Sequence, residues 1–415
     1  MGVRSLYISY DGALDPLGQS QVVPYLTGLA RRGLQLSLLS FEKPSRLSDL
    51  KRRERLEQSL KDAGLRWYPL RYHQHPSLPA TLYDMVRGVV VASRLVREDR
   101  LQVVHARSYV AATMAWLLKR LCGVPFIFDM RGFFADERVE GGLWLQGGIL
   151  YRAAKLMEGR LLAEADQIVS LSEAGRAVLM DWAQKSGYEL PPVHVIPTCV
   201  DCDRFRPNEG PEMGSEGPNL LYLGSVGTWY MLDEMLSFFK ALRGLRPDAR
   251  FTFLTPSPPE TIYGVASTLG IDESAFLVRE VPYETVPENA QEAHASIFFI
   301  KPVSSKRASC PTKMGESLAC GLPVVINPGV GDTEDLVRRE RVGVIVSAWT
   351  EEAYDQAARE LLALLEEGPS LRQRCREVAL RYFSLEVGLS RYEGLYARYG
   401  LKTAASALAQ NGRWP

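Results

Sequence analysis

The 415-residue sequence has no surplus of charge of either sign, since 49 Lys and Arg balance 49 Asp and Glu. A neutral composition gives no support for a basic nucleic-acid-binding surface, so we expect no nucleic-acid partner. Six cysteines in a chain of this length do not indicate a disulfide scaffold. Cys199 and Cys202 form a Cys-x-x-Cys pair, but no second pair or His-x-x-x-His completes a zinc set. We therefore predict that the cysteines are ordinary thiols. No Asp-x-Asp sequence sits on a strand end, so we also predict no metal site.

The sequence also lacks any run of the ~18–20 apolar residues that a membrane-spanning helix needs. The chain enters a strand-like run at Leu6–Ser9 without the layout of a signal peptide. We therefore expect a cytoplasmic protein, with peripheral contact at the inner face of the membrane left open. Arg87, Arg94, Arg97 and Arg100 fall in one helical region that can touch anionic headgroups, although a solvated helix face is the expected explanation.

The chain is too long for one hydrophobic core, so two domains are expected. Short apolar runs alternate with amphipathic helical patterns in both halves, which predicts α/β domains with doubly wound, Rossmann-like parallel sheets. Residues 208–218 are rich in Gly, Pro and Glu and read as a linker. We divide the chain into a first domain of residues 1–206, a second of 207–385, and a helix and tail, 386–415, expected to return to the first domain. The expected strands are Leu6–Ser9, Leu34–Ser40, Arg66–Leu70, Val103–Ala106, Phe126–Asp129, Gln167–Leu171, Val193–Pro197, Leu220–Gly224, Phe251–Leu254, Phe276–Val278, Ser296–Ile300, Val324–Ile326 and Val344–Val346.

The stretch from Pro311 to Asn327 is the most informative part of the sequence. It predicts a loop, a short helix that opens with Pro311, a stop at Gly321 and then a buried strand. The N-terminus of such a helix can bind phosphate through its unpaired N–H groups and its dipole. Glu316, one turn inside the helix, can accept hydroxyls from a sugar on the same phosphate, and Lys313 can add positive charge. The stretch therefore indicates a nucleotide-sugar site.

Two segments resemble glycosyltransferase family 4. The segment from Val195 to Pro207 resembles the family's Ile-Pro-Asn-Gly-Val-Asp-x-x-x-Phe-x-Pro, which closes its N-terminal domain. The segment from Gly315 to Val325 resembles its Glu-Ala-Met-Ala-x-Gly-x-Pro-Val-Val. The resemblance implies the GT-B architecture and a metal-independent, retaining glycosyltransferase that uses a nucleotide sugar. The family also contains sugar-phosphate synthases and phosphorylases.

Departures from the family pattern leave the catalytic residues open. The family's second Glu, which binds the nucleotide ribose, matches Glu316, but Ala308 stands where the first Glu contacts the donor sugar. The Arg and Lys that neutralise the diphosphate are absent from the segment Gly224–Tyr230. Arg131 stands near the place of the family's His after the strand of the first domain. The chain resembles the branch with Pro-(Ser/Thr)-Lys before the second Glu, in which surface-polysaccharide enzymes are common.

A cluster of cations can replace the missing diphosphate pair. The cluster around the phosphate-facing loop comprises Lys301, Lys306, Arg307 and Lys313, and a solvated basic loop is the alternative explanation. The hydroxyls of Ser309 and Thr312 can cap the helix or contact a phosphate oxygen. The backbone N–H groups of Gly224 and Ser225 can also contact phosphate, although a plain tight turn fits as well.

Polar residues at strand ends of the first domain are candidates for the acceptor side. The loop Asp11–Gln19 and the helix after it are expected to contact the acceptor, through Gly18, Gln19 and Ser20, or to take part in closure, and a purely structural loop is the alternative. His105 and Arg107 end a buried strand, and carboxyl ends of parallel strands face the ligand. Asp129 and Arg131, in a dense charged loop, are predicted to reach the reacting sugar or acceptor, with Lys313 as the third catalytic candidate. The alternative for the charged loop is a salt-bridge network.

Together these features predict a retaining hexosyltransferase that moves sugar from a UDP- or GDP-sugar to a glycan or lipid-linked acceptor in surface-polysaccharide or glycoconjugate synthesis. The nucleotide sugar is a substrate, so no cofactor is expected. Front-face attack assisted by the leaving phosphate is what the resemblance implies. A nucleotide-sugar epimerase or sugar-phosphate synthase on the same fold, and a non-catalytic nucleotide-sugar or glycan-binding subunit, are the alternatives.

Overall fold

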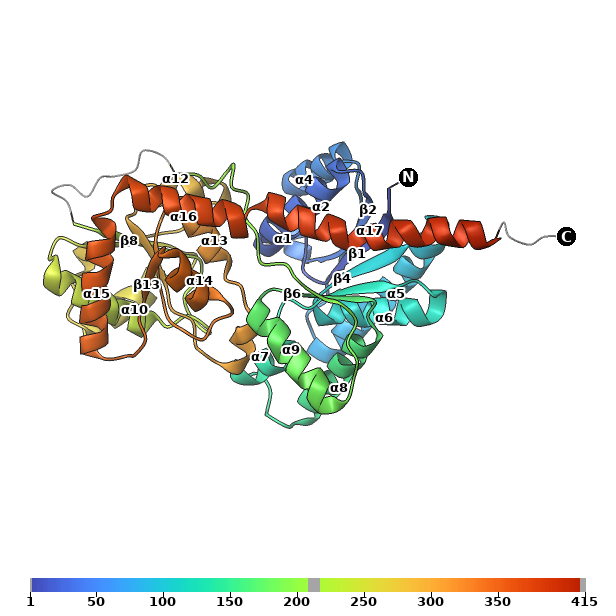
Figure 1. The fold of residues 1–415 in the computed structure, drawn as a ribbon, viewed down its shortest axis with the longest axis horizontal. Helices are drawn as coiled ribbons and strands as arrows, with labels where there is room; N and C mark the ends of the chain where they lie inside the picture. Colours follow the sequence, from blue (N-terminus) through green and yellow to red (C-terminus); the bar gives the residue numbers. More distant parts are fainter. Residues whose placement is uncertain (1, 208–216, 411–415) are drawn as a thin grey trace. The chain divides into compact units, whose positions relative to one another are not determined.

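The computed structural model describes residues 2–207 and 217–410, with side chains described as far as residue 400. Strands and helices alternate along the chain (Figure 1) and divide into two compact units. Unit 1 comprises the residues up to Ile196 and those from Gly388 onward, and unit 2 runs from Pro197 to Val387. The predicted linker falls mainly outside the described residues.

Unit 1 is built on a seven-stranded parallel sheet with the order β3-β2-β1-β4-β5-β6-β7. The central strands are buried along most of their length, which explains why they read as near-continuous apolar runs. The order reverses between β1 and β4, and ligands of doubly wound sheets bind at the carboxyl ends beside such a reversal. The strands are β1 (Arg4–Ser9), β2 (Gln35–Glu42), β3 (Arg66–Arg71), β4 (Val103–Arg107), β5 (Phe126–Asp129), β6 (Gln167–Ser170) and β7 (Val193–Val195).

The helices of unit 1 begin and end at recognisable residues. Ser172 caps α9 by accepting from the backbone N–H of Gly175, and Gly123 and Gly187 end α6 and α9 in the left-handed conformation. The helices are α1 (Pro16–Gln21), α2 (Val23–Arg31), α3 (Pro44–Leu47), α4 (Leu50–Asp62), α5 (Ser77–Glu98), α6 (Ser108–Cys122), α7 (Phe134–Glu140), α8 (Ile149–Glu164), α9 (Glu173–Ser186) and the C-terminal α17 (Leu385–Gln410).

Unit 2 is a second parallel sheet, with the order β10-β9-β8-β11-β12-β13 and a reversal between β8 and β11. Its core is rich in phenylalanine, with Phe251 packed against Phe239 and Phe253 at ring distances of 5.2 and 4.1 Å. The strands are β8 (Asn219–Leu223), β9 (Arg250–Leu254), β10 (Phe276–Arg279), β11 (Ala295–Phe298), β12 (Val324–Ile326) and β13 (Gly343–Ile345). The α-helices are α10 (Leu232–Leu245), α11 (Pro259–Thr268), α12 (Val286–Ala290), α13 (Thr312–Ala319), α14 (Thr333–Glu340), α15 (Glu351–Leu365) and α16 (Pro369–Tyr382).

Each predicted strand is present in the structure, with ends within two residues of those expected. The predicted α/β class with two doubly wound sheets is confirmed. The loop predicted over Asp11–Gln19 is shorter than expected, because α1 begins at Pro16, where proline suits the first turn.

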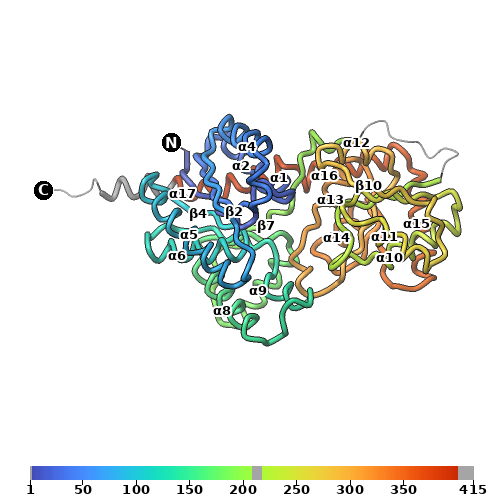
Figure 2. The backbone as a smooth tube through the Cα atoms, turned by 180° about the vertical axis from the view of Figure 1, so that it is seen from behind, coloured from blue at the N-terminus to red at the C-terminus, as the bar shows by residue number. Residues whose placement is uncertain are grey.

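The C-terminal helix α17 packs on unit 1 (Figure 2). Tyr392 meets Tyr25 of α2 edge-on at 5.4 Å, and Glu393 forms a 3.0 Å ion pair with Arg32. By contrast, Val200, which precedes the expected boundary at residue 206, exchanges backbone hydrogen bonds with the Phe383–Leu385 segment within unit 2.

Candidate functional site

In unit 2 the predicted loop–helix–strand stretch forms as α13 and β12. Pro311 is not the first helical residue but lies just before it, and α13 begins at Thr312. Gly321 has a φ of +76°, which lets the chain leave the helix and enter β12 at Val324. Glu316 lies one turn inside the helix and is buried.

The Glu316 carboxylate has a partner that the sequence did not indicate. The hydroxyl of Tyr283 donates to Glu316 Oε1 at 3.0 Å. Tyr283 is in turn stacked under the Arg204 guanidinium, which lies 4.7 Å from the ring centre. Burial raises the pKa of Glu316, while the Tyr283 hydrogen bond and the charge of Lys313 oppose that rise. The hydrogen bond from Tyr283 thus fixes the orientation of the Glu316 carboxylate.

Lys313 lies against the turn that follows β8. Its Nζ is 4.0 Å from the centre of the Tyr230 ring and 5.0 Å from that of Tyr222. A Cβ added at Gly224 would lie 3.0 Å from the same Nζ, and Gly224 itself has a φ of +93°. The positive φ favours glycine at position 224, and the flexible end of Lys313 lies close beside it. The structure thereby brings together Gly224 and Lys313, which are far apart in sequence.

The other predicted donor residues surround this pair with differing exposure. The Lys306 side chain is buried and its Nζ lies 3.9 Å from the centre of the Trp229 ring, whereas Arg307 is exposed. Ser225 is exposed, and its carbonyl accepts from Tyr222 Oη at 2.7 Å. Ser309 and Thr312 are half-buried. Neither is the N-cap residue of α13, because that position is occupied by Pro311.

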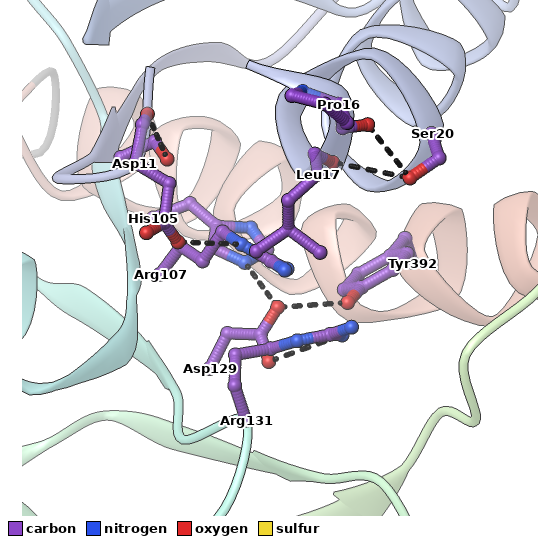
Figure 3. Close-up of polar contacts among 10 residues, drawn as sticks. Asp11, Pro16, Leu17, Ser20, His105, Arg107, Asp129, Arg131 and Tyr392 are labelled. Atoms are coloured by element: carbon purple, nitrogen blue, oxygen red, sulfur yellow. Dashed lines mark hydrogen bonds and ion pairs between the residues drawn. The ribbon is translucent and has the colours of Figure 1, made fainter. Parts of the chain in front are cut away.

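In unit 1 the carboxyl ends of β4 and β5 carry a buried charged cluster (Figure 3). Asp129 is fully buried and accepts from Tyr392 Oη at 2.9 Å. Arg131 Nη1 lies 3.7 Å from Asp129 Oδ1, and His105 Nε2 lies 3.5 Å from Asp129 Oδ2. Burial raises the pKa of Asp129, but the charge of Arg131, the interaction with His105 and the charge of Arg107 together outweigh it and lower this pKa to about 2. The carboxylate is therefore ionised at neutral pH.

His105 is a neutral member of the cluster. Burial lowers its pKa, and its Nδ1 lies 2.7 Å from Tyr396 Oη. The tautomer protonated on Nε2 suits both neighbours, because Nδ1 then accepts from Tyr396 and Nε2–H faces Asp129. Arg131 is consequently the charge that balances Asp129, and the same carboxylate raises the pKa of Arg131 against the effect of burial.

The backbone at Arg131 is held in an unusual conformation. Arg131 has a φ of +63°, which is uncommon for a residue with a side chain, and Gly132 follows at +144°. The Gly132 carbonyl lies 3.1 Å from Tyr109 Oη, which lies 2.7 Å from the buried Glu158. The turn that presents Arg131 is thus secured from α6 and α8.

The acceptor candidates of the first domain have internal partners. Gln19 Nε2 donates to the Ala13 carbonyl at 2.5 Å, and Ser20 Oγ donates to the Pro16 carbonyl at 3.0 Å. A Cβ at Gly18 would lie 2.1 Å from the Gly12 oxygen, so only glycine fits there. These contacts give Gly18, Gln19 and Ser20 a structural role in α1 and in its packing on the preceding loop, and their contact with an acceptor stays a prediction.

His105, Arg107 and Asp129 also differ from the expectation that strand ends face a ligand. All three are buried, and the Arg107 Nε lies 3.7 Å from the half-exposed Asp11. The structure shows the salt-bridge network that was the alternative for Asp129 and Arg131. A catalytic role of these two residues, and an acceptor role of His105 and Arg107, stay predictions.

Besides Tyr283 in unit 2, three residues of unit 1 that contact the predicted residues escaped the sequence reasoning. Tyr392 and Tyr396 lie four residues apart on α17, a spacing that puts both side chains on one face of the helix. The spacing did not indicate that this face packs against the ends of β4 and β5. Glu42 at the end of β2 is buried and accepts from the backbone N–H groups of Ala13 and Leu14 at 2.7 and 3.0 Å. No sequence signal connected it with that loop.

Comparison with known families identifies both units. Residues 19–199 match the sequence model of the glycosyl transferase 4-like domain. Residues 217–364 match that of the glycosyl transferases group 1. The two matches together cover most of the chain. The chain is therefore a glycosyltransferase with a glycosyl transferase 4-like domain followed by a group 1 domain.

The similar proteins agree with this assignment. A D-inositol 3-phosphate glycosyltransferase from Segniliparus rotundus is 25% identical over 300 residues, 69% of this chain and 64% of that protein. Another, from Actinosynnema mirum, is 25% identical over 371 residues, 82% of this chain and 85% of that protein.

Solved structures confirm the GT-B fold. Sucrose-phosphate synthase from Thermosynechococcus elongatus superimposes with a TM-score of 0.70 at 15% identity, covering 96% of this chain and all of that one. Anabaena HepE in complex with UDP-glucose gives a TM-score of 0.68 at 10% identity, covering 95% of this glycosyltransferase and 99% of HepE.

Among the described residues of the glycosyltransferase, no helix is long and apolar enough to cross a bilayer, and no three His, Cys, Asp or Glu side chains are grouped for a metal ion.

Proposed function

We propose that this glycosyltransferase transfers a hexosyl group from a UDP- or GDP-sugar to a glycan or lipid-linked acceptor with retention of configuration. The observation that carries the proposal is the approach of Lys313 to the Gly224 turn, with the oriented Glu316 carboxylate one turn further along α13. The UDP-glucose complex of HepE and the inositol-phosphate glycosyltransferase relatives support a nucleotide-sugar donor.

The donor would bind in unit 2 with its ribose and its diphosphate on different parts of α13. Glu316 would accept the ribose hydroxyls through its other carboxylate oxygen, Oε2. The first N–H groups of α13 would face the diphosphate, whose negative charge the helix dipole favours. Lys313 would supply the cation that the loop after β8 lacks, assisted by Arg307 and by Lys306.

This arrangement suits departure of a nucleoside diphosphate. As the sugar–phosphate bond breaks, negative charge grows on the leaving oxygen, and a prepositioned ammonium group stabilises it without a metal ion. Lys313 is held between two aromatic rings and a glycine turn, so little reorganisation is needed when the charge develops. In the retaining reaction the acceptor would attack the same face that the diphosphate leaves, and the diphosphate would take the acceptor proton.

Binding of uridine and of UDP to matched variants tests the donor assignment. Lys313→Gln should weaken UDP binding by about tenfold to a hundredfold, the value of one charge-assisted hydrogen bond, and leave uridine binding nearly unchanged. Glu316→Gln should weaken both ligands by a similar factor, because both carry the ribose. Lys240→Gln, which removes an exposed lysine from α10, is the control. If the protein binds GDP and not UDP, the same comparison is made with GDP and guanosine in place of UDP and uridine.

An equal loss of UDP and uridine binding in Lys313→Gln would remove the lysine from the diphosphate site. Turnover is measured separately by following the anomeric proton of the product by NMR. Release of an inverted product, or conversion of the nucleotide sugar with no acceptor present, would contradict the retaining transfer.

A further inference from the structure

Arg204 lies in the segment with which unit 2 begins, and its side chain packs on aromatic rings. Its guanidinium lies 4.7 Å from the centre of the Tyr283 ring and 6.0 Å from that of Phe205. The centres of these two rings are 5.8 Å apart. The Arg204 Nη2 atom is buried and has no hydrogen-bond partner among the described residues. The side chain is therefore held by the rings, and above all by Tyr283.

The backbone that carries Arg204 is fixed from two sides. Asp201 Oδ1 accepts from the backbone N–H of Arg204 at 3.3 Å. Arg376 of α16 donates to the Cys202 and Phe205 carbonyls at 2.7 and 2.5 Å. Because these contacts tie the segment to the body of unit 2, the guanidinium is presented to Tyr283 from a defined turn.

The stacked tyrosine connects Arg204 to the buried Glu316 carboxylate. The Tyr283 hydroxyl donates to Glu316 Oε1 at 3.0 Å. Burial raises the pKa of Glu316, and the Tyr283 hydrogen bond, the charge of Lys313 and the charge of Arg204 oppose that rise. The titratable or charged groups that face Glu316 are Tyr283, Lys313, Arg204 and the Cys320 thiol.

We propose that Arg204 is a positioning residue of the nucleotide site, which holds Tyr283 in place for its hydrogen bond to Glu316 and supplies a positive charge beside that carboxylate. The inference rests on the proposed role of Glu316 as the acceptor of the ribose hydroxyls. Arg204 acts through Tyr283 and Glu316 and needs no contact with the ligand itself.

Unit 2 contains a second Arg–Tyr–Glu arrangement outside the predicted nucleotide site. The Arg339 guanidinium lies 5.5 Å from the centre of the Tyr382 ring, and the Tyr382 hydroxyl donates to Glu340 Oε1 at 2.9 Å. This arrangement joins α14 to the end of α16. Arg339→Met therefore removes the same kind of contact from the same unit and is the matched control for Arg204→Met.

The affinity for uridine, measured by ligand-observed NMR between about pH 4 and 8, tests the proposal. Uridine carries the ribose and has no phosphate that titrates, and guanosine takes its place if the protein binds GDP and not UDP. As pH falls, Glu316 takes up a proton and can accept fewer hydrogen bonds, so the wild-type affinity should fall.

Arg204→Met, or Arg204→Gln if the methionine variant does not fold, should weaken uridine binding at neutral pH by roughly threefold to tenfold. It should also move the loss of affinity to higher pH, because removal of a positive charge favours the protonated carboxyl. Arg204→Lys keeps a cation over the ring and should recover most of the affinity. Arg339→Met should bind uridine like the wild type at every pH.

Thermal unfolding checks that each variant is folded, and Glu316→Gln shows whether the effect passes through the carboxylate. In Glu316→Gln the pH dependence should disappear, and a further Arg204→Met change should have a smaller effect than in the wild type.

The proposal is overturned if Arg204→Met keeps the affinity and pH dependence of the wild type, or if Arg339→Met weakens binding equally. An effect of Arg204→Met that is undiminished in Glu316→Gln also overturns it. Wild-type binding by Glu316→Gln would refute the ribose assignment, and the role of Arg204 with it. Weak binding by Glu316→Gln with normal binding by Arg204→Met would refute the role of Arg204 alone.

Discussion

The buried pair of Asp129 and Arg131 makes a quantitative prediction about stability. Asp129 has its pKa lowered from 3.8 to about 2 in the folded protein, a shift that corresponds to roughly 2 kcal/mol of stability at neutral pH. Asp129→Asn removes this contribution and leaves the Arg131 guanidinium, only 11% exposed, without its counter-charge. Removing one partner of a buried ion pair is more costly than the pair is worth, so we expect a loss of about 3 kcal/mol or more.

The pH dependence follows from the sign of the same shift. A carboxylate with a depressed folded pKa binds fewer protons when folded than when unfolded. Its contribution is therefore fully present above the unfolded value near 3.8 and is lost as pH falls toward about 2. In Asp129→Asn, this part of the acid sensitivity of unit 1 should disappear.

Urea unfolding combined with amide hydrogen exchange of α17 measures the effect in the right unit, because Tyr392 ties α17 to Asp129. Asp181→Asn is the control: its partner Lys185 is exposed, so the change should cost no more than about 0.5 kcal/mol. The double variant Asp129→Asn/Arg131→Gln should recover part of the loss, with a coupling of roughly 2 kcal/mol. If Asp129→Asn unfolds and exchanges like Asp181→Asn, the assignment of a strong buried pair is refuted.

Two further changes test the close approaches described above. Gly18→Ala should destabilise unit 1 by about 2 kcal/mol or more, because the new Cβ would lie 2.1 Å from the Gly12 oxygen. The control Gly394→Ala, at a position on α17 where a Cβ meets open space, should stabilise unit 1 by about 0.5–1 kcal/mol. Equal Tm values for the two variants would contradict the packing at Gly18. Tyr283→Phe removes the hydrogen bond that fixes Glu316. Nucleotide affinity measured by titration calorimetry should fall by about fivefold, which corresponds to the net free energy of one hydrogen bond. An unchanged affinity would show that Glu316 needs no orienting partner.

The fold was predictable because its information is local. Buried strands such as Phe126–Asp129 and Val324–Ile326 read as short apolar runs, and glycines such as Gly321 mark the helix ends that separate them. The domain boundary was harder to place, because the conformation around Val200 is decided by hydrogen bonds to Phe383, far away in the sequence.

The candidate site was predictable only where one segment holds both its parts. Lys313 and Glu316 share α13, so their spacing alone placed them together. Tyr283 and Tyr392 reach Glu316 and Asp129 across long stretches of chain, and nothing in a single sequence records such pairings. The burial of Asp129 and His105 was missed for a similar reason. Their positions at strand ends suggested that they face a ligand, but tyrosines of α17 form hydrogen bonds with them.

The return of α17 to unit 1 sets an order on the making of this protein. A ribosome releases residues up to Ile196 long before it has produced Tyr392, so the Asp129–Arg131 pair is formed in a nascent domain that still lacks its last helix. Unit 2 is continuous in sequence and can complete its fold before α17 has been synthesised. Unit 1 would therefore complete its packing last, and a truncation that removes Tyr392 would damage the half of the chain that was synthesised first.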